Sequence, residues 1–267
     1  MKIVVKIGGS LLREGIPDNL LDDVANLSKT DQLSIVHGGG DKVTEIANRL
    51  GKEQKFVVSP EGVRSRYTDR DTVEIYTMVM SGLLAKRIVL SLGSRGVPAV
   101  SVSGLDGSLL TGRRKKKLVV VDERGRKLLI DGGYTGKIES VNARLVDRLL
   151  DEGYVPVVSP IAMGEGSVPL NVDGDAAASA VASGVKADAA IFLTNVEGLL
   201  LDGILVEKLS PDEAKQALPK IGYGMQRKVM AAVDCVNSGV KEAIICSGSR
   251  PAPLSNGLAH RGCTVIS

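Results

Sequence analysis

The stretch IVVKIGGS, at residues 3–10, carries the signal that decides the fold. Its first five positions hold four β-branched apolar side chains and one lysine, which is typical of a buried strand, and the two glycines that follow end that strand. The same arrangement recurs at residues 33–40, where LSIV is followed by HGGG, and a helical pattern over residues 43–50 comes next. Strands that alternate with helices predict βαβ units, in which neighbouring strands run parallel.

The rest of the chain continues this alternation. Further strands are predicted at residues 97–102, 155–158, 189–193 and 243–246, and further helices at 71–92, 173–183 and 225–236. We therefore expect an α/β fold, a three-layer αβα sandwich with a mainly parallel central sheet. A boundary between two lobes is predicted near Gly164-Glu165-Gly166, which divides the chain into residues 1–165 and 166–267.

Composition excludes several classes of protein. The chain has 267 residues and a formal net charge of only +3, which is too small to indicate nucleic-acid binding by itself. The absence of Trp and the presence of only two Phe leave few platforms for base stacking. Three cysteines and two histidines, none of them clustered, predict no metal site. No apolar run approaches the roughly 18 residues of a membrane span, so a soluble, cytoplasmic protein with no membrane partner is expected.

One basic segment interrupts the α/β pattern. Residues 118–121 and 127–130 predict a β-hairpin. Between Arg113 and Lys127 there are eight Lys or Arg and two acidic residues, a local charge of +6. Lysines on an edge strand can simply deter aggregation, whereas a basic patch can also steer an acidic partner or RNA. The scarcity of aromatic residues argues against RNA.

Glycine-rich loops follow the predicted strands at the edge where open parallel sheets bind ligands. These loops lie at residues 8–10 and 38–40, and a polar loop lies at 194–195. Glycine lets backbone N–H groups approach an anion, although such glycines can also serve only as tight turns. Residues 38–43 do not form a dinucleotide-binding fingerprint, because Val43 stands where that motif needs its third Gly or Ala. Residues 132–138 do not form a P-loop, because Ile138 stands where that motif needs Ser or Thr.

Four side chains are candidates for binding anions or cations at this edge. Lys6, inside an apolar strand, is costly to bury unless it meets an anion. Lys228, in the first turn of a helix predicted to start near Met225, opposes the helix dipole unless a phosphate lies there. Asp175 could hold both ammonium groups or merely favour a helix start, and Arg66 could bind a carboxylate or lie in solvent.

Taken together, these segments resemble the amino acid kinase family, and within it the acetylglutamate kinases. The resemblance rests on residues 6–10, 37–40, 66–69, 171–175 and 224–228, in that order, with 194–198 similar to the nucleotide loop although Asp is commoner than Asn195. It implies an ATP lobe at 166–267 and a substrate lobe at 1–165. The implied catalytic residues are Lys6, Lys228 and Asp175; the substrate-binding residues are Gly39, Gly40, Arg66 and Asn171; the ATP-binding residues are Gly8, Gly9, Ser10, Thr194, Asn195, Gly198 and Met225.

Residues 59–69 and 132–137 are similar to the branch of this family that acts on amino acids attached to the small acidic carrier protein LysW. The resemblance implies ATP-dependent phosphorylation of the side-chain carboxylate of LysW-linked 2-aminoadipate, with LysW-linked glutamate as a further substrate, in lysine and arginine biosynthesis. Mg²⁺ would arrive with ATP, and a homodimer is the default assembly. The carrier-binding patch would comprise Arg113, Arg114, Lys115, Lys116 and Lys117. A kinase for free N-acetylglutamate and a non-catalytic nucleotide or amino-acid sensor remain alternatives.

Overall fold

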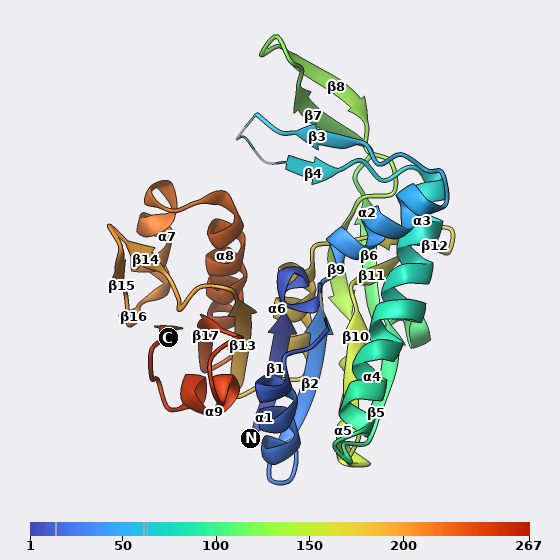
Figure 1. Ribbon diagram of the computed structural model, residues 1–267. Helices are drawn as coiled ribbons and strands as arrows, with labels where there is room; N and C mark the ends of the chain where they lie inside the picture. Colours follow the sequence, from blue (N-terminus) through green and yellow to red (C-terminus); the bar gives the residue numbers. More distant parts are fainter. Residues whose placement is uncertain (14, 61, 63) are drawn as a thin grey trace.

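The computed structural model describes residues 1–267 except 14, 61 and 63, and it is built around one eight-stranded sheet (Figure 1). The strand order is β16-β18-β17-β13-β1-β2-β10-β5, and all neighbouring pairs are parallel except β17 with β18. The strands are β1 Lys2–Ile7, β2 Gln32–His37, β5 Ala99–Ser103, β10 Val155–Ser159, β13 Ala189–Thr194, β16 Lys208–Leu209, β17 Glu242–Ser247 and β18 Thr264–Ile266. The predicted parallel sheet is confirmed, except that β5 begins after Pro98 rather than at residue 97 because proline cannot donate a backbone hydrogen bond.

Helices cover both faces of this sheet, which confirms the three-layer αβα sandwich. The apolar core on one face is completed by α5 to α8, and the core on the other face by α1, α4 and α9. The helices are α1 Asp18–Leu27, α2 Gly40–Arg49, α3 Arg70–Thr77, α4 Ala85–Gly93, α5 Ala143–Asp151, α6 Gly174–Gly184, α7 Pro211–Ala217, α8 Tyr223–Asn237 and α9 Pro253–Leu258, with short 3-10 turns at Gly9–Leu12, Asp106–Ser108 and Leu218–Lys220.

The predicted helix at 71–92 is continuous from Arg70 to Gly93, but its middle, Met78–Leu84, is a π-helical turn between α3 and α4. By length and composition it is the one helix among the described residues that is apolar enough to cross a membrane, contrary to the expectation from the sequence. Its buried side chains, among them Met80 and Ile88, pack in the protein core. This packing accounts for part of its apolar composition.

Smaller sheets stand at the carboxyl end of the parallel strands (Figure 1). The predicted basic hairpin is confirmed as the antiparallel pair β7–β8, and a second hairpin, β3–β4, lies beside it. The predicted lobe boundary falls in the turn between β11 and β12, while the central sheet takes strands from both sides of residue 165. The remaining strands are β3 Phe56–Val58, β4 Arg64–Arg66, β6 Leu110–Arg114, β7 Lys117–Val121, β8 Lys127–Asp131, β9 Gly136–Val141, β11 Ile161–Gly164, β12 Val168–Asn171, β14 Leu200–Leu201 and β15 Ile204–Leu205.

Candidate functional site

Two lysines share one buried carboxylate at the carboxyl end of β1. The Lys6 ammonium lies 2.7 Å from Asp175 Oδ1, and the Lys228 ammonium lies 3.1 Å from Asp175 Oδ2. Lys6 and Asp175 are only 6% and 5% exposed. The structure therefore brings together three side chains that are separated by up to 222 positions in the sequence.

Strand alternation places Lys6 in this cluster. Val4 belongs to the core on the α6 and α8 face, while Ile3, Val5 and Ile7 belong to the core on the opposite face. Because successive side chains of a strand point to opposite faces, Lys6 points to the same face as Val4. That face carries α6, which supplies Asp175, and α8, which supplies Lys228.

The start of α6 is built to present Asp175. Asp173 caps this helix by accepting hydrogen bonds from the backbone N–H groups of Asp175 and Ala176, at 2.9 and 3.0 Å. A side chain at Gly174 would lie 3.6 Å from Lys6 Cε, an ordinary van der Waals contact, so the start of α6 lies directly against the lysine stem. The capping role belongs to Asp173, which leaves the Asp175 carboxylate to the two ammonium groups.

The charges in this cluster act on one another strongly. Burial alone would raise the pKa of the Asp175 carboxyl, but the charges of Lys6 and Lys228 outweigh burial and hold its pKa below the ordinary value. Burial and the neighbouring Lys6 charge lower the pKa of Lys228, although Asp175 opposes both effects. The cluster has one carboxylate for two ammonium groups, so an anion placed beside it would be stabilised.

The predicted position of Lys228 in its helix is wrong. Helix α8 begins at Tyr223, with Gly222 as N-cap, so Lys228 lies in the second turn rather than the first. The helix dipole acts mainly within the first turn, so repulsion by the dipole is no argument for a phosphate at this lysine. Its burial beside Lys6 is the stronger evidence.

The two glycine-rich loops pack directly against each other. A side chain at Gly9 would lie 2.9 Å from the backbone nitrogen of Gly39, and one at Gly38 would lie 2.8 Å from that of Gly9. Gly39 has φ of +154° and faces Leu84, which also leaves no room for a side chain. These glycines are required for the close approach of the loops after β1 and β2, which is more than a tight turn demands.

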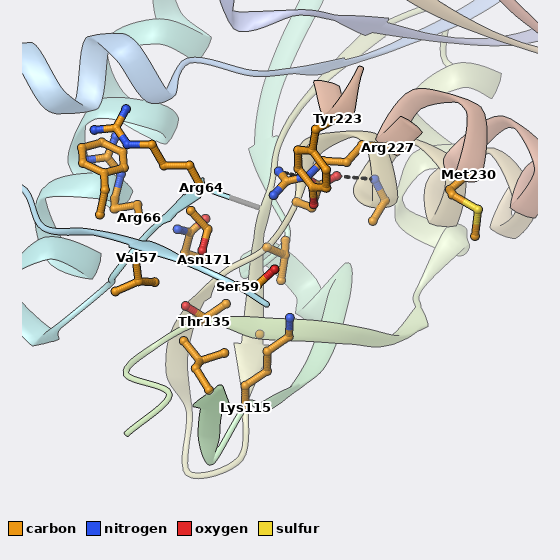
Figure 2. A pocket seen from close by; sticks show the side chains of 18 of the residues that line it. Val57, Ser59, Arg64, Arg66, Lys115, Thr135, Asn171, Tyr223, Arg227 and Met230 are labelled. Atoms are coloured by element: carbon orange, nitrogen blue, oxygen red, sulfur yellow. Dashed lines mark hydrogen bonds and ion pairs between the residues drawn. The ribbon is translucent and has the colours of Figure 1, made fainter. Parts of the chain in front are cut away.

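Arg66 and Asn171 line a cleft of about 870 Å³ between the hairpins and α8 (Figure 2). The Arg66 guanidinium donates to the carbonyl oxygen of Gly40 at 2.7 Å and to Thr44 Oγ1 at 2.8 Å, and it also bonds Gln54 Oε1. Asn171 Nδ2 donates to Thr68 Oγ1 at 2.9 Å. Arg66 therefore links the cleft to the second glycine loop through Gly40.

Cations from several elements surround this cleft. Arg64 and Arg66 of β4 lie on one side, with Arg64 stacked over Phe56 at 4.0 Å, and Arg227 of α8 lies across from them (Figure 2). Lys115 also lines the cleft. Two carboxylates line it as well, and that of Asp173 is bonded to Arg227 at 2.9 Å. Four cations against two carboxylates favour an anionic ligand.

Three of the residues expected to bind ATP, Thr194, Asn195 and Gly198, lie at the end of the neighbouring strand β13 and in the loop that follows it. Thr194 ends β13, which pairs with β1, and its hydroxyl donates to Asn195 Oδ1 at 3.3 Å. A side chain at Gly198 would lie 2.6 Å from Thr264 Oγ1, so this glycine has a packing role. Met225 is partly buried and packs on the core.

Comparison with known proteins shows the family to which the chain belongs. A model of the amino acid kinase family matches residues 1–247. The chain belongs to the amino acid kinase family. It is similar to the [LysW]-aminoadipate/[LysW]-glutamate kinase of Metallosphaera sedula, with 48% identity over 264 residues (98% of this chain and 99% of the relative), and to that of Saccharolobus islandicus strain L.S.2.15, with 45% identity over 265 residues (99% of each).

Solved structures agree with this assignment. The N-acetylglutamate synthase of Neisseria gonorrhoeae, in complex with coenzyme A and N-acetyl-glutamate, matches all of this chain with a TM-score of 0.81 and 26% identity, and this chain spans 59% of it. The predicted resemblance to the amino acid kinases is therefore confirmed, and the chain is a phosphotransferase of that family.

The basic segment of this amino acid kinase does not form one uniform patch. Arg113 and Arg114 end β6, where they form ion pairs with Glu139 at 3.1 Å and Asp131 at 2.8 Å. Lys115 lines the cleft, while Lys116 and Lys117 are exposed at the start of the hairpin. The two arginines are thus partly neutralised within the chain.

Other cleft residues were not singled out from the sequence. Arg64, Tyr223 and Arg227 line the cleft, but no spacing pattern in the sequence marks them. Alternation within β4, which puts Arg64 and Arg66 on the same face of a strand, was the one available clue. Gln54 and Thr44, which hold Arg66, could be identified only in three dimensions.

Proposed function

We propose that this chain transfers the terminal phosphoryl group of ATP to the side-chain carboxylate of 2-aminoadipate, and also of glutamate, when the amino acid is linked to the acidic carrier protein LysW. The observation that carries the proposal is the buried Lys6–Asp175–Lys228 cluster beside the two packed glycine loops. The family and the names of the similar proteins support the same reaction.

Phosphoryl transfer to a carboxylate needs no covalent bond between the substrate and the protein. A carboxylate is already ionised, so its oxygen attacks the γ-phosphorus without a general base while the bond to the ADP oxygen breaks. Lys6 and Lys228 would neutralise the charge on the transferring group, and Asp175 would hold both ammonium groups in place. Backbone N–H groups of Gly8, Gly39 and Gly40 would cradle the phosphoryl oxygens.

The remaining residues would bind the two substrates. Arg66 and Asn171, in the cleft, would hold the amino-acid end of the acceptor. ATP would bind along Gly8, Gly9, Ser10, Thr194, Asn195, Gly198 and Met225. Among the residues that the structure describes, no group of three or more His, Cys, Asp or Glu is placed to hold a metal. Mg²⁺ bound to the ATP phosphates would neutralise part of their charge.

A carrier of acidic composition fits the charge of this face. The cleft has more cations than carboxylates, and the exposed Lys116 and Lys117 extend the positive charge beyond it. Because Arg113 and Arg114 already have acidic partners, we assign the larger share of carrier attraction to Lys115, Lys116 and Lys117. The carrier would thus approach past the start of β7 while its attached amino acid enters the cleft.

Cytoplasmic location and a homodimer complete the proposal. Two apolar side chains of the long helix, Met78 and Leu90, are 56% and 73% exposed, and a second copy packed on this helix would cover them. Analytical ultracentrifugation of the wild type and of Leu90→Glu tests the dimer. A monomeric wild type would contradict it.

A side-by-side assay separates this function from its nearest rival. ATP turnover is measured with LysW-linked aminoadipate, LysW-linked glutamate and free N-acetylglutamate. The double variant Lys116→Ser/Lys117→Ser should raise KM for the LysW-linked substrates about tenfold and leave the catalytic constant for any free substrate unchanged. Lys208→Ser/Lys220→Ser removes the same charge from another exposed surface and serves as the control. Turnover of free N-acetylglutamate alone would overturn the proposal.

A further inference from the structure

The histidine that precedes the second glycine loop is buried and bonded on both sides of its ring. His37 ends β2 and has 0% exposure. Its Nδ1 lies 3.0 Å from the carbonyl oxygen of Gly38, and its Nε2 lies 2.9 Å from Ser159 Oγ at the end of β10. Ser159 Oγ also lies 3.3 Å from the carbonyl oxygen of Met80, in the π-helical turn.

Counting protons fixes the tautomer of this ring. A carbonyl oxygen can only accept, so Nδ1 must carry the proton that is shared with Gly38. Nε2 then accepts from the Ser159 hydroxyl, because that hydroxyl has a single proton. The Met80 carbonyl does not need this proton, since it already accepts from the backbone N–H of Ala85. With a neutral ring every one of these groups is satisfied.

The bond to Gly38 has a consequence on the other side of the same peptide unit. In a trans peptide the C=O and the N–H point in opposite directions, so anchoring the Gly38 carbonyl also sets the direction of the Gly39 N–H. That nitrogen faces the first glycine loop, where a side chain at Gly9 would come within 2.9 Å of it. A peptide unit between two glycines is easily flipped, because glycine tolerates conformations closed to other residues. The hydrogen bond from His37 to the Gly38 carbonyl therefore keeps this peptide unit in one orientation.

We propose that His37, oriented by Ser159, is a positioning residue that locks the Gly38–Gly39 peptide plane so that the Gly39 N–H faces the transferring phosphoryl group. The inference rests on the proposed function, which assigns the Gly39 N–H to that group. His37 itself contacts no reacting atom in this account. It acts through the backbone of the glycine loop.

The buried position of His37 keeps its ring neutral. Burial is the main cause, and the charge of Lys6 on the adjacent strand β1 adds to it; together they lower the pKa of His37 to about 4. The bond to the Gly38 carbonyl opposes this shift only in part. The ring is therefore neutral at neutral pH, as it must be for Nε2 to accept the hydrogen bond from Ser159.

The tautomer can be measured directly, because the chain has only two histidines. Long-range ¹H–¹⁵N spectra of protein with ¹⁵N-labelled histidine distinguish the two tautomers, and His260→Gln identifies the signals of His37. The expected result is a neutral Nδ1–H ring between pH 8 and pH 5, which is retained in Ser159→Ala because the Gly38 carbonyl still requires a proton on Nδ1. An Nε2–H ring in the wild type would overturn the proposal, whichever substrate the protein uses.

Two variants of similar size test the effect on catalysis. Asn at position 37 keeps an N–H donor near the place of Nδ1, whereas Leu removes it. We expect kcat of His37→Leu to be at least about tenfold below that of His37→Asn, with KM for ATP within about threefold. Equal losses in both variants, or a loss confined to KM, would contradict a positioning role. If the wild type fails to turn over LysW-linked substrates, the proposed function is wrong, and the spectra still test whether His37 holds the Gly38–Gly39 peptide plane.

Discussion

Replacing Asp175 by Asn removes the one negative charge that two buried ammonium groups share. The side chains of Lys6, Lys228 and Asp175 are 8%, 15% and 7% exposed, so water cannot replace the lost carboxylate. Removing one partner of a buried ion pair costs about 3–5 kcal/mol. Here the two remaining cations also repel each other. We therefore expect the free energy of unfolding of Asp175→Asn to fall by about 3–5 kcal/mol at neutral pH.

Mg·ATP should reverse part of this loss. Its phosphates would bring negative charge to the ammonium groups, so ATP should raise the melting temperature of Asp175→Asn more than that of the wild type. Turnover should fall more than affinity for ATP, because the variant holds the lysines less firmly in the transition state. Urea unfolding, thermal unfolding with and without Mg·ATP, and steady-state kinetics provide these three quantities.

Asp173→Asn is the matched control. Asn caps a helix about as well as Asp, and the ion pair of Asp173 with Arg227 is partly exposed, at 37% for each side chain. This variant should lose no more than about 1 kcal/mol. An Asp175→Asn protein as stable as this control, or one that gains no more from ATP than the wild type, would refute the reasoning about the cluster.

Variants at Lys228, Gly9 and His37 test other contacts of the site. Lys228→Met should lower kcat by roughly 10²-fold to 10³-fold with little change in KM for ATP, as for a lost stabiliser of transition-state charge, and near-normal turnover would exclude the lysine from that role. Gly9→Ala should separate the two glycine loops and reduce kcat at least about tenfold, whereas Gly93→Ala, where nothing lies within 4 Å, should match the wild type in kinetics and be no less stable in urea unfolding. The folded-state pKa of His37, about 4, lies below its ordinary value of 6.5, so the contribution of the neutral ring to stability is complete above pH 6.5 and is lost as the pH falls toward 4. Between pH 7 and pH 4.5 the free energy of unfolding in urea should therefore fall by about 2–3 kcal/mol more in the wild type than in His37→Leu. Equal decreases in the two proteins would contradict the buried neutral ring.

The fold could be predicted because its signals are local. Apolar runs that end at glycine, such as residues 3–10 and 33–40, mark strands without any knowledge of their partners. The order of the strands in the sheet, in which β13 and β2 flank β1, depends on contacts far apart in the sequence and could not be read from those runs. The π-helical turn at Met78–Leu84 also left no sequence signal, since its composition suits an ordinary core helix.

The site could be predicted in part. Order along the chain suggested Lys6, Asp175 and Lys228, and the structure brings them into contact. The sequence predicts that the side chain of Lys6 points to the same face of the sheet as Val4, because side chains alternate along a strand. It does not predict that α6 and α8 cover that face, because their position depends on tertiary packing. The ion pair of Arg113 with Glu139, 26 positions further along the chain, is likewise visible only in three dimensions.

The most direct test of the central claim is to trap the product of the reaction. An acyl phosphate reacts with hydroxylamine to give a hydroxamate, so protein, ATP and LysW-linked aminoadipate are incubated with hydroxylamine and the carrier is analysed by mass spectrometry. The proposed function predicts a hydroxamate on the aminoadipate side chain, formed in step with ADP and greatly reduced in Lys228→Met. Release of ADP without a hydroxamate on the carrier, together with hydroxamate formation on free N-acetylglutamate, would contradict it.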